Sequence, residues 1–277
     1  MTHTTALEKL ERSLHCGQAT AAHENSQLTL LGWVATVRNH GGVIFVDLRD
    51  HTGIVQLVLD PANKALLELG QQLRSEFVIG VTGTVQRRAA AAINKNIPTG
   101  EIEVMVDTLV ILNKCSPLPF PIDDHNTAEE LRLTYRYLDL RRSAMQKNLR
   151  LRHDLLFTIR SYMNEQGFCE IETPTLSKST PEGARDFIVP ARTNPGEFFA
   201  LPQSPQIYKQ LLIASGMDKY FQIARCYRDE DLRANRQPEF TQLDMELAYA
   251  TEEKIYALLE GIMGTLWKTF FGKTLEL

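Results

Sequence analysis

Short segments that alternate between apolar and polar residues dominate the first part of the chain. They cover 27–38, 42–50, 53–60, 76–88 and 100–111, and an alternation with a period of two predicts a β-strand in each. Between the third and fourth segments, a proline precedes leucines at near-helical spacing, which predicts one helix within 61–77. Three strands, a helix and two strands are the order of a five-stranded OB-fold β-barrel, whose open face commonly binds single-stranded nucleic acid or sugars.

A proline-containing stretch follows the barrel and predicts a domain boundary. Three prolines in "SPLPFP" forbid a regular helix and favour an extended path. We therefore assign 1–110 to the barrel domain, 111–128 to a linker and 129–277 to a second domain. The expected fold class is α+β.

In the second domain, the apolar spacing predicts both helices and strands. One long amphipathic helix is expected within 131–167, with one apolar side formed by Leu149, Leu156, Ile159 and Met163. Further helices are expected at 204–216 and 251–271. Expected strands are one in 168–177 that Pro174 stops, 187–190 and 198–201, together with a strand hairpin that ends near residue 247.

The predicted hairpin carries charges where a covered strand is expected to be apolar. Successive strand side chains point to opposite faces, so one face holds Thr241, Leu243, Met245 and Leu247, and the other Phe240, Gln242, Asp244 and Glu246. A solvated outer face is the simplest explanation of such charges. However, the next segment is an apolar helix, so the sheet is expected to be covered, and covered charges are costly unless paired or bound. A ligand with both positive and negative groups would satisfy them.

Composition narrows the class of protein. The 277 residues are 43% hydrophobic and 23% charged, with a net charge of −4, which argues against a polyanion binder held by bulk charge. Four widely spaced cysteines form no CxxC pair, so neither a zinc site nor a disulfide framework is indicated, and reduced thiols in the cytoplasm fit best. No run of 18 apolar residues and no signal-peptide core occur, so we expect neither secretion nor a membrane span.

The predicted barrel has an outward aromatic side chain with polar neighbours. Ile44, Val46 and Leu48 supply the core face of their strand, so Phe45 points outward. An outward aromatic can stack a nucleobase, worth about 1–3 kcal/mol, although packing at a strand edge would also explain it. Arg38 and Gln56 nearby favour base recognition, because a guanidinium and an amide can read base edges.

Five motifs together resemble one enzyme family. The hairpin "CYRDEDLRANRQPEFTQLDMEL" resembles motif 2 of class II aminoacyl-tRNA synthetases, and the helix leading to "GFCEIETPTLS" resembles motif 1. With "TPEGARDFIVP", "LPQSPQIYKQLL" and "YRYLDLRR", the chain is similar to bacterial aspartyl-tRNA synthetases from about Cys16 onward. The resemblance implies an anticodon-binding OB-fold followed by an antiparallel class II sheet with flanking helices. Such enzymes activate L-aspartate with ATP to aspartyl-adenylate and transfer aspartate to the 3′ end of tRNA-Asp.

The resemblance also implies roles for single residues. Arg228 is the expected catalytic residue, holding the α-phosphate and the substrate carboxylate, with Glu230 and Gln237 on ATP and Phe240 stacked on adenine. For aspartate, the implied binding residues are Glu182 at its ammonium group, Gln206, Lys209, and Asp244, which orders the pocket. Mg²⁺ is expected with the ATP phosphates, and its protein ligands stay unassigned. Taken alone, Lys209 would be a solvated helix lysine and Glu182 a turn cap, and Glu246 is left as structural.

In the barrel, the implied anticodon contacts are Arg38, Phe45 and Gln56, with Asn94 as a further candidate. His40 with Gly41, and small residues near Ala91, resemble the enzymes of this family that charge both tRNA-Asp and tRNA-Asn. His40 on a surface loop without that role is the alternative. The expected partners are tRNA-Asp with tRNA-Asn as a second substrate, L-aspartate, ATP and a second copy of the chain in a homodimer.

The family continues past Leu277, with an inserted domain and a motif 3 that contributes an arginine to the ATP site. We therefore expect this chain to be an N-terminal piece with negligible aspartate-dependent exchange between ATP and pyrophosphate. Two alternatives stay open at this point: a noncatalytic module that binds tRNA and dimerises, and a sister synthetase for asparagine or lysine. "TPEGARD" and "QSPQIYKQ" argue against the sister enzymes.

Overall fold

A computed structural model describes residues 10–180 and 182–275. The chain forms two compact units, Met1–Lys147 and Asn148–Leu277, each with its own core. Among the described residues, every helix is too short or too polar to cross a membrane.

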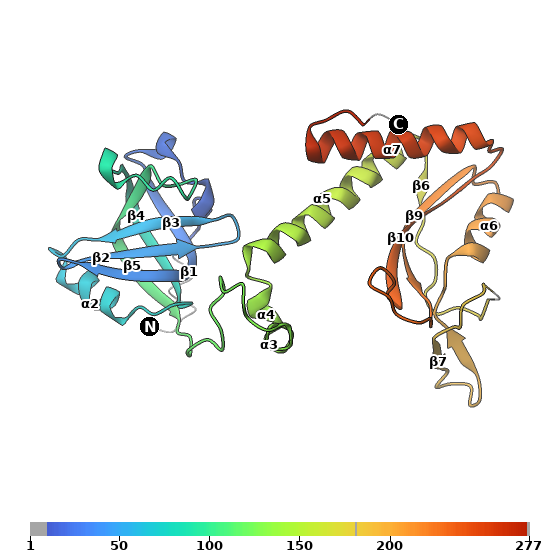
Figure 1. The fold of residues 1–277 in the computed structure, drawn as a ribbon, viewed down its shortest axis with the longest axis horizontal. Coiled ribbons are helices and arrows are strands. Elements are labelled where there is room, and N and C mark those ends of the chain that lie inside the picture. The colour runs from blue at the N-terminus through green and yellow to red at the C-terminus, as the bar shows by residue number, and fades with distance from the viewer. Residues whose placement is uncertain (1–9, 181, 276–277) are drawn as a thin grey trace. The chain divides into compact units, whose positions relative to one another are not determined.

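The first unit contains a closed barrel (Figure 1). Its strands pair in the order β1 (Gln27–His40), β2 (Val43–Arg49), β3 (Ile54–Leu59), β5 (Ile102–Asn113) and β4 (Val78–Arg87), and α2 (Lys64–Gln72) lies between β3 and β4 in the chain. All pairings are antiparallel except β3 with β5. The predicted five-stranded barrel with one helix is confirmed. The first unit also contains three short 3₁₀ helices, η1 (Cys16–Gln18), η2 (Ala21–His23) and η3 (Ala90–Ala92).

Alternation along β2 decides what lies inside the barrel. Ile44, Val46 and Leu48 are 0–2% exposed and belong to the barrel core, whereas Phe45 and Asp47 between them are half-buried. Phe45 therefore points away from the core, as the sequence predicted.

The linker forms a small core of its own within the first unit. Phe120 and Ile122 pack with Leu138, which lies in the second of three consecutive helices, α3 (Glu129–Thr134), α4 (Arg136–Asp139) and α5 (Ser143–Glu165). The single long helix expected within 131–167 is therefore wrong at its start. Tyr135 leaves the helical region with φ −107° and ψ 50°, and this bend lets Leu138 reach the linker, so tertiary packing overrides local helix propensity. Within α5, Ile159 and Met163 are buried as expected, but Leu149 is 49% exposed.

The second unit is built on a three-stranded sheet (Figure 1). Its order is β10 (Glu239–Leu247), β9 (Lys219–Tyr227) and β6 (Cys169–Glu170), with β9 antiparallel to β10 and parallel to β6. The expected strand that Pro174 stops is thus shorter than predicted, at two residues, and it pairs parallel with β9. Before the proline, the hydroxyl of Thr173 donates to the side chain of Gln222 at 2.9 Å. A separate hairpin, β7 (Ile188–Pro190) with β8 (Phe198–Ala200), confirms the other two predicted strands.

Helices cover one face of this sheet. Phe221 of β9 packs with Leu243 and Met245 of β10, against Ile159 and Met163 of α5 and against two residues of α7 (Glu252–Phe271), Leu258 and Ile262. The predicted apolar face of the hairpin is therefore confirmed, and the alternate residues of β9 and β10 lie on the other face.

Candidate functional site

The strand register gathers polar side chains on the face of the sheet away from α5 and α7. Asp244 pairs with Gln222, Glu246 with Tyr220, and Phe240 with Cys226. Because cross-strand partners point to the same side, these residues share one surface. The helix α6 (Gln206–Ala214) contacts both strands.

A lysine from α6 joins the two acids of this face. The Nζ of Lys209 lies 2.9 Å from Oδ1 of Asp244 and 3.4 Å from Oε2 of Glu246, and the side chains of Lys209 and Asp244 are only 13% and 9% exposed. Burial lowers the pKa of Lys209, but the two carboxylates outweigh burial and raise it. Burial raises the pKa of Asp244, with Glu246 acting in the same direction and Lys209 opposing both. Glu246, which the sequence left as structural, is therefore part of the charged cluster.

A buried thiol lies among the charges expected to bind aspartate. Cys226 is fully buried. Its pKa is raised to about 11, first by burial and then by Asp244 and Glu182, while Arg228 and Lys209 act in the opposite direction. All four charged residues were predicted from the sequence, and each of them acts on the pKa of Cys226. The sequence offered no signal for this cysteine beyond its position on the polar side of β9.

Glu182 is held between its own loop and the start of α6. Its carboxylate accepts hydrogen bonds from Oγ1 of Thr180 at 3.2 Å and from Oγ of Ser204 at 2.7 Å. The side-chain amide of Gln203, which is 1% exposed, donates to the backbone carbonyl of Ala184 at 2.8 Å and accepts from the backbone N–H of Ala184 at 3.1 Å. The sequence analysis did not single out Gln203 and Ser204, although "PQSP" just before a helix is a signal for polar anchoring there. Gln206 is half-buried at the first turn of α6.

Arg228 and Phe240 meet where the hairpin closes. The backbone N–H of Arg228 donates to the carbonyl of Pro238 at 2.9 Å, and its guanidinium carbon lies 5.1 Å from the centre of the Phe240 ring, a cation–π contact. Glu230 and Gln237 lie in the loop between β9 and β10, and both are exposed. The structure therefore brings Arg228 to Phe240 but leaves Glu230 and Gln237 open to solvent.

The carboxylates of this face already have partners. Asp244 and Glu246 contact Lys209, and Glu182 accepts from two hydroxyl groups. Mg²⁺ is commonly bound through one or two carboxylates together with substrate phosphates and water, so these contacts assign no protein ligand to an ion that would arrive with ATP.

In the barrel, three predicted residues lie on one outward face. Arg38 pairs with Phe45 across β1 and β2, and Asp47 pairs with Gln56 across β2 and β3. The guanidinium of Arg38 binds Asp47 through both oxygens, at 2.7 and 2.9 Å. The ion pair orients the arginine beside the aromatic ring, and it leaves Phe45 and Gln56 half-buried at the surface.

A buried arginine beside this face was missed from the sequence. Arg88 is 8% exposed, its Nε donates to the carbonyl of Ile102 at 2.8 Å, and its Nη2 has no hydrogen-bond partner among the described residues. Burial lowers its pKa, whereas Glu103 and Asp47 raise it, so Arg88 lies near the Arg38–Asp47 pair. "RR" at the end of a strand hinted at a cation, but only the fold shows which arginine is buried.

The remaining predicted barrel residues lie at a strand end and in the segment between β4 and β5. His40, at the end of β1, and Ala91, in η3, are exposed. Asn94 is half-buried and its Oδ1 accepts from the backbone N–H of Asn96 at 3.0 Å. Their expected roles at tRNA stay predictions.

Comparisons with known proteins agree with both units. The family model described as tRNA synthetases class II (D, K and N) matches residues 128–277, and the model for an OB-fold nucleic acid binding domain matches residues 28–112. An aspartate–tRNA(Asp/Asn) ligase of Legionella pneumophila (strain Corby) is 53% identical over 265 residues, covering 95% of this chain and 45% of the relative. One from Persephonella marina is 52% identical, covering 98% of this chain and 45% of the relative. The chain therefore spans less than half the length of these relatives.

A solved structure shares the fold. The crystal structure of asparaginyl-tRNA synthetase from Pyrococcus horikoshii, complexed with asparaginyl-adenylate, superposes with a TM-score of 0.82 at 26% identity. The match covers 94% of this chain and 58% of that one.

Proposed function

Because the chain belongs to the class II tRNA synthetases (D, K and N), we propose that it is the N-terminal part of an aspartate–tRNA ligase. The relatives named as aspartate–tRNA(Asp/Asn) ligases align over nearly the whole chain at 52–53% identity, which favours aspartate over the sister amino acids asparagine and lysine. The proposed substrates are L-aspartate, ATP and tRNA, and the proposed compartment is the cytoplasm.

The proposed reaction has two steps. An oxygen of the α-carboxylate of aspartate attacks the α-phosphorus of ATP, and the bond to the bridging oxygen breaks so that pyrophosphate leaves. A ribose hydroxyl at the tRNA 3′ end then attacks the activated carbonyl, loses its proton, and releases AMP. The first step joins two anions, so the site must offset their repulsion and align them, and no nucleophilic side chain is needed.

One observation supports this proposal above the others: a single sheet face holds an arginine on an aromatic ring and a buried lysine between two acids. We assign Phe240 to stack on adenine and Arg228 to bridge the α-phosphate and the attacking carboxylate, because a planar guanidinium can bind two oxygens at once. Glu230 and Gln237, on the exposed loop, are proposed to contact ATP after the loop closes over it.

The lysine cluster supports selectivity for aspartate. Lys209 already pairs with Asp244 and Glu246, and we propose that it turns one contact toward the side-chain carboxylate of aspartate. Asparagine offers no charge there, so its binding would leave the lysine less well paired. Glu182 is assigned to the substrate ammonium group, and Gln206 to the rim of the same pocket.

For tRNA, we propose that the anticodon binds the barrel face formed by Arg38, Phe45 and Gln56, with Asn94 at its edge. Both compared relatives are named for tRNA(Asp/Asn), so charging of tRNA-Asn as well as tRNA-Asp is part of the proposal, with His40 and Ala91 as discriminating positions. A homodimer is also proposed, and the exposed Phe157 on α5 (65% exposed) supports a partner on that helix.

Aspartate-dependent exchange between ATP and pyrophosphate in the full-length protein tests the site residue by residue. Lys209→Met is expected to raise KM for aspartate about 10- to 100-fold while KM for ATP changes little, because a hydrogen bond to a charged group contributes about 1.5–3 kcal/mol. Phe240→Leu is expected to raise KM for ATP while KM for aspartate changes little. Lys178→Met, at an exposed lysine, is the matched control.

Equal effects of Lys209→Met and Phe240→Leu on both substrates would contradict the assigned pockets. Tight tRNA binding without any exchange would instead support the noncatalytic alternative. For tRNA choice, charging of purified tRNA-Asp and tRNA-Asn is compared between the full-length protein and its His40→Leu variant, and failure to charge tRNA-Asn would refute relaxed specificity.

A further inference from the structure

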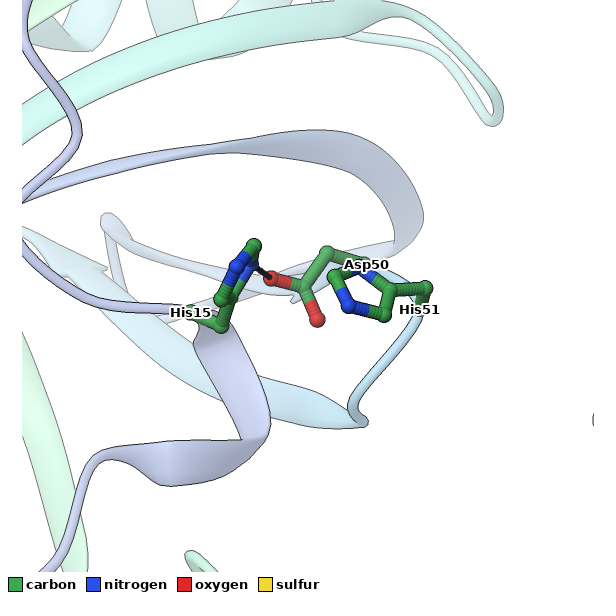
Figure 2. A group of neighbouring side chains, drawn as sticks. All are labelled: His15, Asp50 and His51. Atoms are coloured by element: carbon green, nitrogen blue, oxygen red, sulfur yellow. Dashed lines mark hydrogen bonds and ion pairs between the residues drawn. The ribbon is translucent and has the colours of Figure 1, made fainter. Parts of the chain in front are cut away.

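A cluster of three side chains lies at one end of the barrel and belongs to neither proposed surface. His15 precedes η1, Asp50 follows β2, and His51 begins the turn between β2 and β3 (Figure 2). One ligand atom from each residue lies within 4.8 Å of the others. In Figure 2 a dashed line joins the ring of His15 to the carboxylate of Asp50, and His51 is the next residue in the chain.

The carboxylate at the centre is held in place before any ligand arrives. Oδ2 of Asp50 accepts from the backbone N–H of Cys16 at 2.8 Å, and Oδ1 accepts from the backbone N–H and the hydroxyl of Thr52 at 2.8 and 2.6 Å. These hydrogen bonds orient the carboxylate, whose side chain is only 3% exposed.

The backbone keeps His15 beside this anion. A Cβ added to Gly17 would lie 2.4 Å from the carbonyl oxygen of Thr52, so η1 and the turn pack backbone against backbone and only glycine fits. Nδ1 of His15 lies 3.1 Å from Oδ2 of Asp50. A His–Asp contact of this kind by itself is a common structural bond.

A structural hydrogen bond between His15 and Asp50 would not require a second imidazole, and His51 provides one. The ring of His51 meets that of His15 edge to face, with centroids 4.4 Å apart. His51 is exposed and lies between β2 and β3. Two imidazoles and one carboxylate are a donor set of zinc sites, in which bonds of about 2.0–2.2 Å draw the ligand atoms together and water fills the open position.

We propose that His15, Asp50 and His51 bind a divalent transition-metal ion of the zinc class. The bound ion joins the segment before β1 to the β2–β3 turn, and it stabilises the folded barrel by mass action. The backbone and hydroxyl bonds to Asp50 act as the outer shell that orients the carboxylate.

Zn²⁺ titration of the chelator-treated chain, followed by calorimetry, tests the site. We expect one equivalent to bind, with affinity lowered at least about tenfold in His51→Ala. The metal-free thermal midpoint of His51→Ala is measured alongside, so that a loss of affinity is told apart from a loss of folding. His153→Ala, at an exposed histidine on α5, is the matched control.

Co²⁺ provides a second readout, because a four-coordinate site gives strong visible absorption, whereas the hydrated ion absorbs only weakly. That absorption is expected in the unmodified chain and in His153→Ala, and it is expected to be lost in His51→Ala. The proposal is overturned by no binding of Zn²⁺, by equal affinity in His51→Ala, or by an equal loss in both variants.

Discussion

Lys209→Met is the substitution whose cost follows most directly from the structure. It removes the cation that lies 2.9 Å from Asp244 and 3.4 Å from Glu246. Breaking a buried pair costs about 3–5 kcal/mol, because the remaining charge stays uncompensated. Asp244 is 9% exposed on its side chain, whereas Glu246 is 33% exposed and can be hydrated. The penalty therefore falls mainly on Asp244, and we expect a loss of about 2–4 kcal/mol in unfolding free energy at pH 7.

The pH dependence distinguishes this electrostatic cause from lost packing. An unpaired Asp244 can escape its penalty by taking up a proton, at a cost of at most about 4 kcal/mol at pH 7 and about 1.5 kcal/mol at pH 5, given an ordinary aspartate pKa near 3.9. The folded variant then holds a proton that the unfolded chain has released, so its stability falls as the pH rises above that value. The difference from the unmodified chain should thus shrink to about 1.5 kcal/mol at pH 5.

Urea unfolding followed by the fluorescence of Trp267 measures this difference. Trp267 lies on α7, in the same unit as Lys209, and Trp33→Phe removes the barrel signal. Lys178→Met should change stability by less than about 0.5 kcal/mol, as for other exposed positions. A loss in Lys209→Met that is below this value at pH 7, or that is the same at pH 5 and pH 7, would refute the reasoning.

Two further predictions concern other buried groups. With its pKa near 11, Cys226 has about one thiolate in a thousand at pH 8, so iodoacetamide should modify it at least about 100-fold more slowly than an ordinary cysteine. Peptide mass spectrometry against the exposed Cys169 checks this, and comparable rates would contradict the burial. Glu76, 3% exposed, accepts hydrogen bonds of 2.6–2.8 Å from Arg49 and Arg141. Glu76→Gln should therefore lower the stability of the barrel by about 2–3 kcal/mol. The fluorescence of Trp33, in a chain in which Trp267 is substituted, measures that loss. A change in unfolding free energy under about 0.5 kcal/mol would show that water replaces the carboxylate as the partner of the arginines.

Periodicity along the chain was enough to define the barrel. Alternation placed Phe45 outward and its neighbours inward, and a period of two leaves no other choice once one face is buried. The same rule separated the apolar and polar faces of the β9–β10 hairpin. These features are local, because each depends only on the order of residues within one or two strands.

Tertiary packing decided what local pattern could not. The chain bends at Tyr135 because Leu138 packs on the linker, and no helical periodicity encodes that contact. Likewise, the sequence placed Lys209 on a helix and Asp244 on a strand 35 residues away, and it could not bring Glu246 and Cys226 into the same cluster. Burial and pKa depend on every atom around a group, and those atoms come from distant segments whose proximity exists only in the folded chain.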